Sequence, residues 1–101
     1  MSNSNLVVMT AARAQPGKEQ DAQQALLDVA KAARTQSGCL DCNIFRSTED
    51  SAMTTNFERW SSKEERDAFL AGPHVKKFIA TVAGAFVESP KPVLYQEIDE
   101  A

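Results

Sequence analysis

The chain has 101 residues, of which 43% are hydrophobic and 25% are charged. This composition is typical of one ordinary globular domain and excludes a collagen-like rod, a chain that is disordered throughout and a disulfide-knotted toxin. The 14 acidic residues outnumber the 11 basic ones, for a net charge of −3, which argues against a nucleic-acid partner. No run approaches the roughly 20 apolar residues that span a bilayer, so no membrane partner is expected either.

We expect no secretory signal at the amino terminus. Residues 1–5 are polar, with neither a basic stretch nor a long apolar stretch, so we expect a short disordered tail followed by a single domain at 6–99. The expected compartment is the cytoplasm, where Cys39 and Cys42 stay reduced.

The first predicted elements are a strand and a helix. Residues 6–14 are apolar on both faces near their start, which is typical of a central strand. Pro16 and Gly17 end that strand, and an alanine-rich stripe at helical spacing predicts a helix over 18–36. Gly38 is typical of a left-handed helix stop.

A predicted hairpin follows. Strands are expected over 39–47 and 53–60, and the polar turn between them is short enough to make the two antiparallel. The period-two alternation of the later strand places Asn56, Glu58 and Trp60 on one side.

Two helical stretches and a last strand complete the pattern. Ser62 with Glu65 three residues later forms a capping box, which predicts a helix to about Ala71. Gly72 and Pro73 break it. Helical spacing then continues over 74–86, and the last strand is expected over 93–98.

The order β-α-β-β-α-β predicts an α+β fold of the ferredoxin-like type. It implies a four-stranded antiparallel sheet with both helical segments on one face. The other face would remain apolar and uncovered, and monomers seldom expose a large apolar patch. We therefore expect a homodimer with the two sheets packed face to face.

The two cysteines form a Cys-x-x-Cys motif, which in other proteins is a redox pair or half of a zinc site. A redox pair normally opens a helix, whereas this one starts a strand whose alternation would put the thiols on opposite faces. A zinc site needs two more ligands, and His74 is the sole histidine. Packed, inert thiols are the favoured interpretation, with Cys42 expected among the residues that line the pocket.

Asn56, Glu58 and Trp60 are the strongest candidates for chemistry. If their side of the strand faces the helices, an amide, a carboxylate and an indole N–H converge on a sheltered space. A buried carboxylate must be paired or keep its proton, and either state suits proton transfer near neutral pH. The structural alternative is a simple ion pair, for example with Arg46 or a lysine.

His74 opens the second helical stretch. A neutral imidazole near a positive helix end suits a proton acceptor. The alternative is a capping or surface histidine.

Four short motifs occur in an order that resembles the antibiotic biosynthesis monooxygenase family. They are Pro16-Gly17-Lys18-Glu19, Ser37-Gly38-Cys39-Leu40, Phe57-Glu58-Arg59-Trp60-Ser61-Ser62 and Gly72-Pro73-His74. The resemblance spans about residues 6–98. It implies a dimeric α+β barrel with a cavity between sheet and helices in each subunit. Family members include oxidases of quinols that need neither metal nor flavin, haem-degrading proteins and sugar isomerases.

Departures from the family pattern narrow the choice. Phe69 stands where many members carry a histidine of the sugar-isomerising site, which disfavours that branch. The haem-degrading branch would require a tryptophan at Phe69 and an axial histidine at Ile79, so haem binding is disfavoured as well. The spacing of Asn56 and Trp60 matches members of the quinol-oxidising branch.

The sequence is therefore compatible with two functions. The first is a monooxygenase that needs no cofactor or metal and oxidises a quinol, polyphenol or similar electron-rich aromatic compound with O2. Glu58 or His74 would accept the proton, Asn56 and the Trp60 N–H would hold oxygen atoms, and the apolar wall would come from Phe69, Phe78 and Phe86. The alternative is a dimeric binding or stress-response module without chemistry. A cavity of a few hundred Å3 with Glu58 or His74 in its wall would favour the enzyme.

Overall fold

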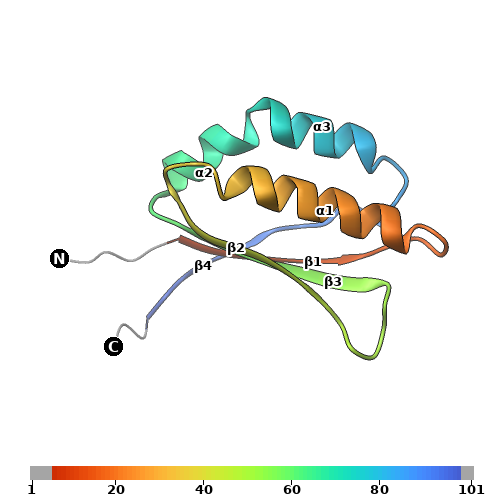
Figure 1. Cartoon of the computed structure of the whole chain (residues 1–101). Coiled ribbons are helices and arrows are strands. Elements are labelled where there is room, and N and C mark those ends of the chain that lie inside the picture. The colour runs from red at the N-terminus through yellow and green to blue at the C-terminus, as the bar shows by residue number, and fades with distance from the viewer. Residues whose placement is uncertain (1–5, 99–101) are drawn as a thin grey trace.

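The computed structural model describes residues 6–98 of the chain. The tail expected at 1–5 and the domain end expected at residue 99 lie outside the described residues. Seven elements follow one another in Figure 1, in this order: β1 (Leu6–Arg13), α1 (Glu19–Ala33), β2 (Cys39–Arg46), β3 (Met53–Trp60), α2 (Lys63–Leu70), α3 (Pro73–Thr81) and β4 (Val93–Gln96).

The four strands form one antiparallel sheet in the order β2-β3-β1-β4. The helices all lie on one face of this sheet (Figure 1). The predicted α+β, ferredoxin-like arrangement is therefore confirmed, and β1 is a central strand as its apolar sequence indicated. The centre of the sheet is the β1–β3 pair, in which Thr10 lies opposite Asn56 and Val8 opposite Glu58.

The second helical stretch is shorter than the expected 74–86. Helix α3 ends at Thr81, and Gly84 then takes a positive φ of 81° that ordinary residues rarely adopt. The chain returns to the sheet at once, because Phe86 pairs with Ala14 in an isolated antiparallel bridge. Hydrogen bonding to the end of β1 therefore replaces the last helical turn that the spacing predicted.

The alternation predicted for β2 is wrong at its start. A register shift between Cys39 and Asp41 places Cys39 opposite Trp60 and Cys42 opposite Glu58. Because Glu58 and Trp60 share one face of β3, both thiols lie on the helix-facing side. A bulge inserts one extra residue into a strand, and this reverses the alternation beyond it.

Gly38 is not the left-handed stop that its position suggested, since only Gly17 and Gly84 have positive φ within the described residues. Its small size matters for another reason. A Cβ at this position would collide with the side chain of Glu65, so the glycine lets the start of β2 approach α2 closely.

Two clusters of buried residues lie between the sheet and the helices. Trp60 and Phe69 anchor one of them, together with Ala30 and Ala33 of α1. The other joins Ala22 and Ala25 of α1 to the segment after α3. Alanines along α1 let this helix lie close to the strands. No helix within residues 6–98 is long and apolar enough to cross a membrane.

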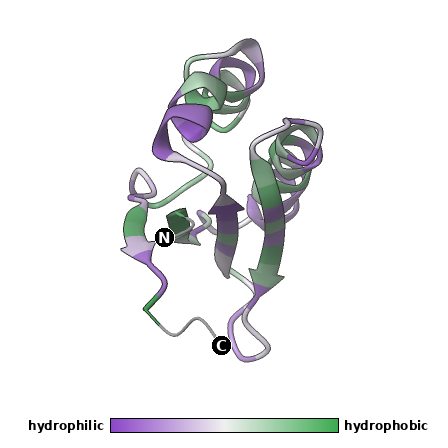
Figure 2. Ribbon diagram, turned by 90° about the vertical axis from the view of Figure 1, so that its left-hand side faces the viewer, coloured by the Kyte–Doolittle hydropathy of each residue, from purple (hydrophilic) through white to green (hydrophobic). Residues whose placement is uncertain are grey.

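The face of the sheet opposite the helices carries large apolar side chains. Figure 2 shows hydrophobic stretches in the strands as well as in the helices. Met9, Phe45, Val93 and Tyr95 are each 40% to 56% exposed, and their register places them on the side away from α1. This uncovered face is the surface on which the dimer expectation depends.

Candidate functional site

A cavity of about 520 Å3 lies between the sheet and the helices. Its floor comes from β1, β2 and β3, and its walls come from α1, α2, α3 and the segment that follows α3. Ile79, Glu88 and Ser89 also line it and are exposed, so they mark its opening. A space of this size is typical of small-molecule sites.

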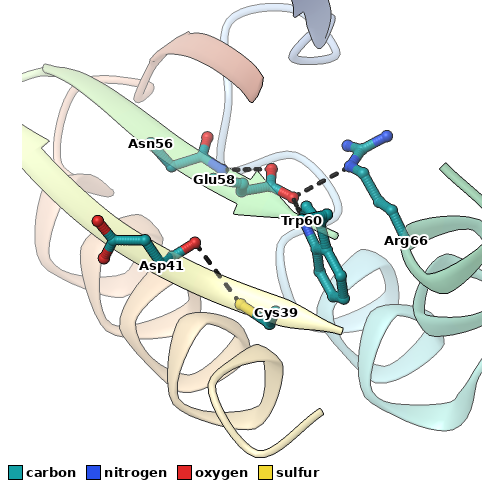
Figure 3. A network of polar contacts seen from close by, with 6 residues as sticks. All are labelled: Cys39, Asp41, Asn56, Glu58, Trp60 and Arg66. Carbon is teal, nitrogen blue, oxygen red and sulfur yellow. Dashed lines mark hydrogen bonds and ion pairs between the residues drawn. The ribbon is translucent and has the colours of Figure 1, made fainter. Parts of the chain in front are cut away.

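Glu58 lies at the polar end of this cavity and is only 8% exposed. The Trp60 Nε1–H donates to Oε1 over 2.9 Å, and the Asn56 Nδ2 donates to Oε2 over 3.0 Å. Arg66 adds a third donor, with its Nε 3.0 Å from Oε1. Figure 3 shows the three donors converging on the one carboxylate. Three donors around two oxygens suit an ionised acid, which only accepts hydrogen bonds.

Arg66 is not among the residues predicted from the sequence, and no ion pair between Glu58 and Arg46 forms within the described residues. Arg46 instead donates to Gln23 at the surface. Arg66 is only 6% exposed. Helical spacing from the Ser62 cap could have identified it, because Arg66 lies three residues before Phe69 on the inward side of α2.

The expected aromatic wall forms around the rest of the cavity. Phe69, Phe78 and Phe86 all line it. The ring of Phe69 packs 5.7 Å from that of Trp60, and the rings of Phe78 and Phe86 lie 6.4 Å apart. Trp60 itself is fully buried and does not line the cavity. Its indole N–H contacts the Glu58 carboxylate, which does.

His74 lies outside this cavity. Its ring stacks on the outer side of Phe69 at 6.2 Å. It lines a different depression, with Lys77 and Thr81 of α3 and residues of α1. Of the two proton acceptors expected from the sequence, the cavity therefore contains Glu58 only.

The thiol of Cys42 lines the cavity as expected. Burial raises its pKa to about 12, and the neighbouring Glu58 charge acts in the same direction. Burial also raises the pKa of Cys39. Because the thiolate is the reactive form, both cysteines are poor nucleophiles at neutral pH. Within residues 6–98 no three His, Cys, Asp or Glu side chains come together as a metal site.

The chain is thus a small α+β protein with a ferredoxin-like sheet, helices on one side of it and a carboxylate at the end of an apolar cavity. The chain belongs to the antibiotic biosynthesis monooxygenase family, whose sequence model matches residues 5–81. The match covers more than half of the chain and includes every polar residue of the Glu58 network.

Solved structures share the complete fold. The protein PA3566 of Pseudomonas aeruginosa superposes with a TM-score of 0.89 at 17% identity, over 95% of this chain and 96% of its own. Rv0793 of Mycobacterium tuberculosis gives a TM-score of 0.88 at 20% identity, over 97% and 99% of the two chains. SO0527 of Shewanella oneidensis gives 0.84 at 19% identity, over 95% and 93%. Identities this low establish the fold alone. No curated protein sequence matches the chain.

Proposed function

We propose that this protein is a monooxygenase that oxidises an electron-rich aromatic compound, such as a quinol or polyphenol, with O2 and without a cofactor. The observation that carries the proposal is a buried carboxylate, Glu58, which three donors hold in the wall of a cavity of about 520 Å3. Family membership and the spacing of Asn56 and Trp60 support the same reaction class.

The reaction needs a proton acceptor in a cavity from which most water is excluded. A phenolic hydroxyl that enters the cavity gives its proton to Glu58, and the resulting anion passes an electron to O2 far more readily than the neutral phenol does. For a phenol with an unsubstituted position, the products that balance are a quinone and one water molecule. General base catalysis of this kind contributes about 10²–10⁴-fold.

The surrounding residues have distinct tasks. Asn56 and Trp60 fix both oxygens of Glu58, so the carboxylate does not reorganise when substrate arrives. The Trp60 N–H is engaged with Glu58 and acts as a positioning group rather than as a contact for substrate oxygen. The rings of Phe69, Phe78 and Phe86 would hold the flat face of the aromatic substrate.

We also propose that the protein is a homodimer through the uncovered face of the sheet. Met9, Phe45, Val93 and Tyr95 give that face its apolar character. A second copy offers the same apolar surface, so a twofold arrangement would cover both patches at once. In this form the protein acts on a small aromatic molecule and O2, with itself as its only macromolecular partner.

Oxygen uptake tests the function directly. Purified protein, treated with a chelator, is screened with quinols and catechols in an oxygen electrode, and uptake should rise in proportion to protein concentration. The variant Glu58→Gln should retain the fold and lose at least about 100-fold in turnover, because an amide does not accept the proton. The variant Glu64→Gln removes an exposed carboxylate of α2 and should match the native protein.

A folded Glu58→Gln protein with native turnover would contradict the proposal. Binding of aromatic compounds without any oxygen uptake would favour the alternative, a binding module that uses the same cavity.

A further inference from the structure

The terminal nitrogens of Arg66 are unusual for a buried arginine. The side chain reaches Glu58 through Nε only. Neither Nη atom has an acceptor within residues 6–98, and Figure 3 shows both lying beyond Nε on the side away from the carboxylate. Within the described residues, no fully buried side-chain nitrogen or oxygen lacks a partner, so the Nη atoms are not fully buried. Because Arg66 lines the cavity, we infer that these donors face the cavity.

The other donors near Glu58 are uncharged and largely engaged with its carboxylate. The only N–H of the Trp60 ring binds Oε1, and the Asn56 amide gives one of its two N–H groups to Oε2, which leaves one uncharged donor at that position. A negative charge that develops on a ligand oxygen beside Glu58 would therefore find its main stabilisation in the Arg66 guanidinium, which offers a fork of parallel N–H groups.

Few other charges face this position. Among residues 6–98, Arg66 is the only cation that lines the cavity, and α1 and α3 contribute apolar residues to its walls. The remaining titratable groups in the lining are Glu58 of β3, Cys42 of β2, and Glu88 at the exposed rim. The raised pKa keeps the Cys42 thiol neutral at neutral pH. Arg34 donates through Nε to the Cys42 carbonyl over 2.9 Å but does not line the cavity. The ionisation of a bound phenol therefore depends chiefly on the Glu58–Arg66 pair.

We propose that Arg66 exchanges its partner during the reaction: it neutralises Glu58 in the empty site and the phenolate oxygen once Glu58 has taken the phenol's proton. This inference rests on the proposed function. The phenol O–H bond breaks, an O–H bond forms on Glu58, and no electron moves in this step. The total charge of the cavity stays the same, so the transfer leaves no uncompensated ion in a poorly solvated space.

The exchange defines a substrate class. The ligand enters as a neutral phenol and presents one hydroxyl oxygen that donates to Glu58 and accepts from Arg66. A methyl ether of the same ring would have no proton to give. An aromatic carboxylate would arrive charged and place two anions beside one guanidinium.

Binding of 4-nitrophenol tests the exchange without turnover, because only its ionised form absorbs visible light strongly. At equal pH, the ionised fraction of bound ligand should be highest in Glu58→Gln, intermediate in the native protein and lowest in Arg66→Gln. The two variants should differ at least about 100-fold in the ionisation constant, since one leaves an unpaired cation and the other an unpaired anion. The variant Arg66→Lys should lie between native and Arg66→Gln, because a lysine keeps a charge for Glu58 without the fork.

Turnover measurements distinguish an Arg66 that exchanges its partner from an Arg66 that only forms a structural ion pair with Glu58. Glu58→Gln should bind the nitrophenolate more tightly than native while losing oxygen uptake, so affinity and turnover move in opposite directions. If phenolate affinity falls in both Glu58→Gln and Arg66→Gln, or if 4-nitrophenol does not bind the native protein at millimolar concentration, the inference is wrong. The variant Lys63→Gln removes an exposed cation of α2 and should change neither readout.

The two proposals fail differently. Oxygen uptake with some phenol, but without the predicted order of ionisation, would overturn the exchange and leave the proposed function. The predicted order without oxygen uptake for any phenol would overturn the proposed function and leave Arg66 as the phenolate-binding residue. Circular dichroism of each variant confirms that the comparison is made between folded proteins.

Discussion

At the scale of single residues, the position of Glu58 is fixed more firmly than that of a typical surface acid. Its carboxylate has donors from the same strand, in Asn56 and Trp60, and from a helix, in Arg66. Hydrogen bonds to a charged group contribute about 1.5–3 kcal/mol each, and their loss also leaves the charge poorly solvated. Each donor therefore affects both stability and the geometry of the cavity.

The variant Trp60→Phe separates the indole N–H from the rest of the side chain. It should lower the free energy of unfolding by about 2 kcal/mol or more, because Glu58 loses a charge-assisted donor and the core loses volume. Turnover should fall about tenfold as the carboxylate becomes less fixed. Urea denaturation and oxygen uptake measure the two effects. Leu6→Ala, which reduces packing against the same cluster, removes no hydrogen bond and changes a residue outside the cavity lining, is the matched control. Equal turnover in Trp60→Phe and the native protein would contradict a positioning role.

The buried Cys42 thiol makes stability depend on alkaline pH. Its pKa rises from the ordinary value of 9.0 to about 12 on folding, chiefly through burial. A raised pKa means that its contribution to stability is complete below pH 9 and is lost as pH rises toward 12. The free energy of unfolding should decline over this range with a slope of up to about 1.4 kcal/mol per pH unit from this group. Urea denaturation of native protein and Cys42→Ala measures the difference. Parallel slopes for the two proteins would show that the thiol ionises freely in the folded state.

At the scale of elements, helix α2 connects the hydrogen bond that caps its amino end with the position of Arg66 in the site. The Ser62 side chain accepts a hydrogen bond from the Glu65 backbone N–H over 3.2 Å, which fixes the first turn of the helix that carries Arg66. The predicted cap is confirmed.

The variant Ser62→Ala should lower the free energy of unfolding by about 1 kcal/mol. It should also weaken 4-nitrophenol binding, because a frayed first turn holds Arg66 less firmly. Thermal unfolding and the binding titration provide the two readouts. Ser61→Ala changes an exposed neighbour with no capping contact and should behave as native. An equal loss of stability in both variants would remove the connection between the cap and the site.

Strands and helices differ in how well the sequence predicted them. Period-two alternation predicted β3 from Met53 to Trp60 correctly, because this strand has no irregularity. It failed in β2, where the bulge after Cys39 changes the register, and a local pattern contains no signal for an extra residue. The end of α3 was missed because the apolar spacing continues through Phe86, although that residue pairs with Ala14 of the returning chain. Contacts between distant segments decided both cases.

At the scale of the whole molecule, the proposed dimer can be tested through the uncovered face. The variant Phe45→Lys places a charge on a side chain that is 56% exposed on that face, and it should shift the protein toward monomers. Leu27→Lys alters an exposed leucine on α1, on the helical side, and should leave the assembly unchanged. Analytical ultracentrifugation measures both. A native protein that sediments as a monomer at all concentrations would contradict the dimer.

The sequence predicted the architecture of the whole molecule more completely than its site. Element order and apolar patterning were enough for the fold, since each strand and helix carries its own signal. The alignment of Asn56, Glu58 and Trp60 also followed from β3 alone. The pairing of Glu58 with Arg66 required the packing of α2 on the sheet, and the exclusion of His74 required the direction of α3 after the Gly72–Pro73 break. Neither is encoded in a local pattern.

Trp60 is the only tryptophan in the chain, and it lies fully buried with its N–H on the Glu58 carboxylate. All indole fluorescence of the native protein therefore originates beside the site, in a dry surrounding that favours blue-shifted emission. Any event that alters Glu58, whether proton uptake or the arrival of an aromatic ligand, changes the environment of this one fluorophore. The protein thus carries a built-in optical probe of its own cavity and needs no attached label.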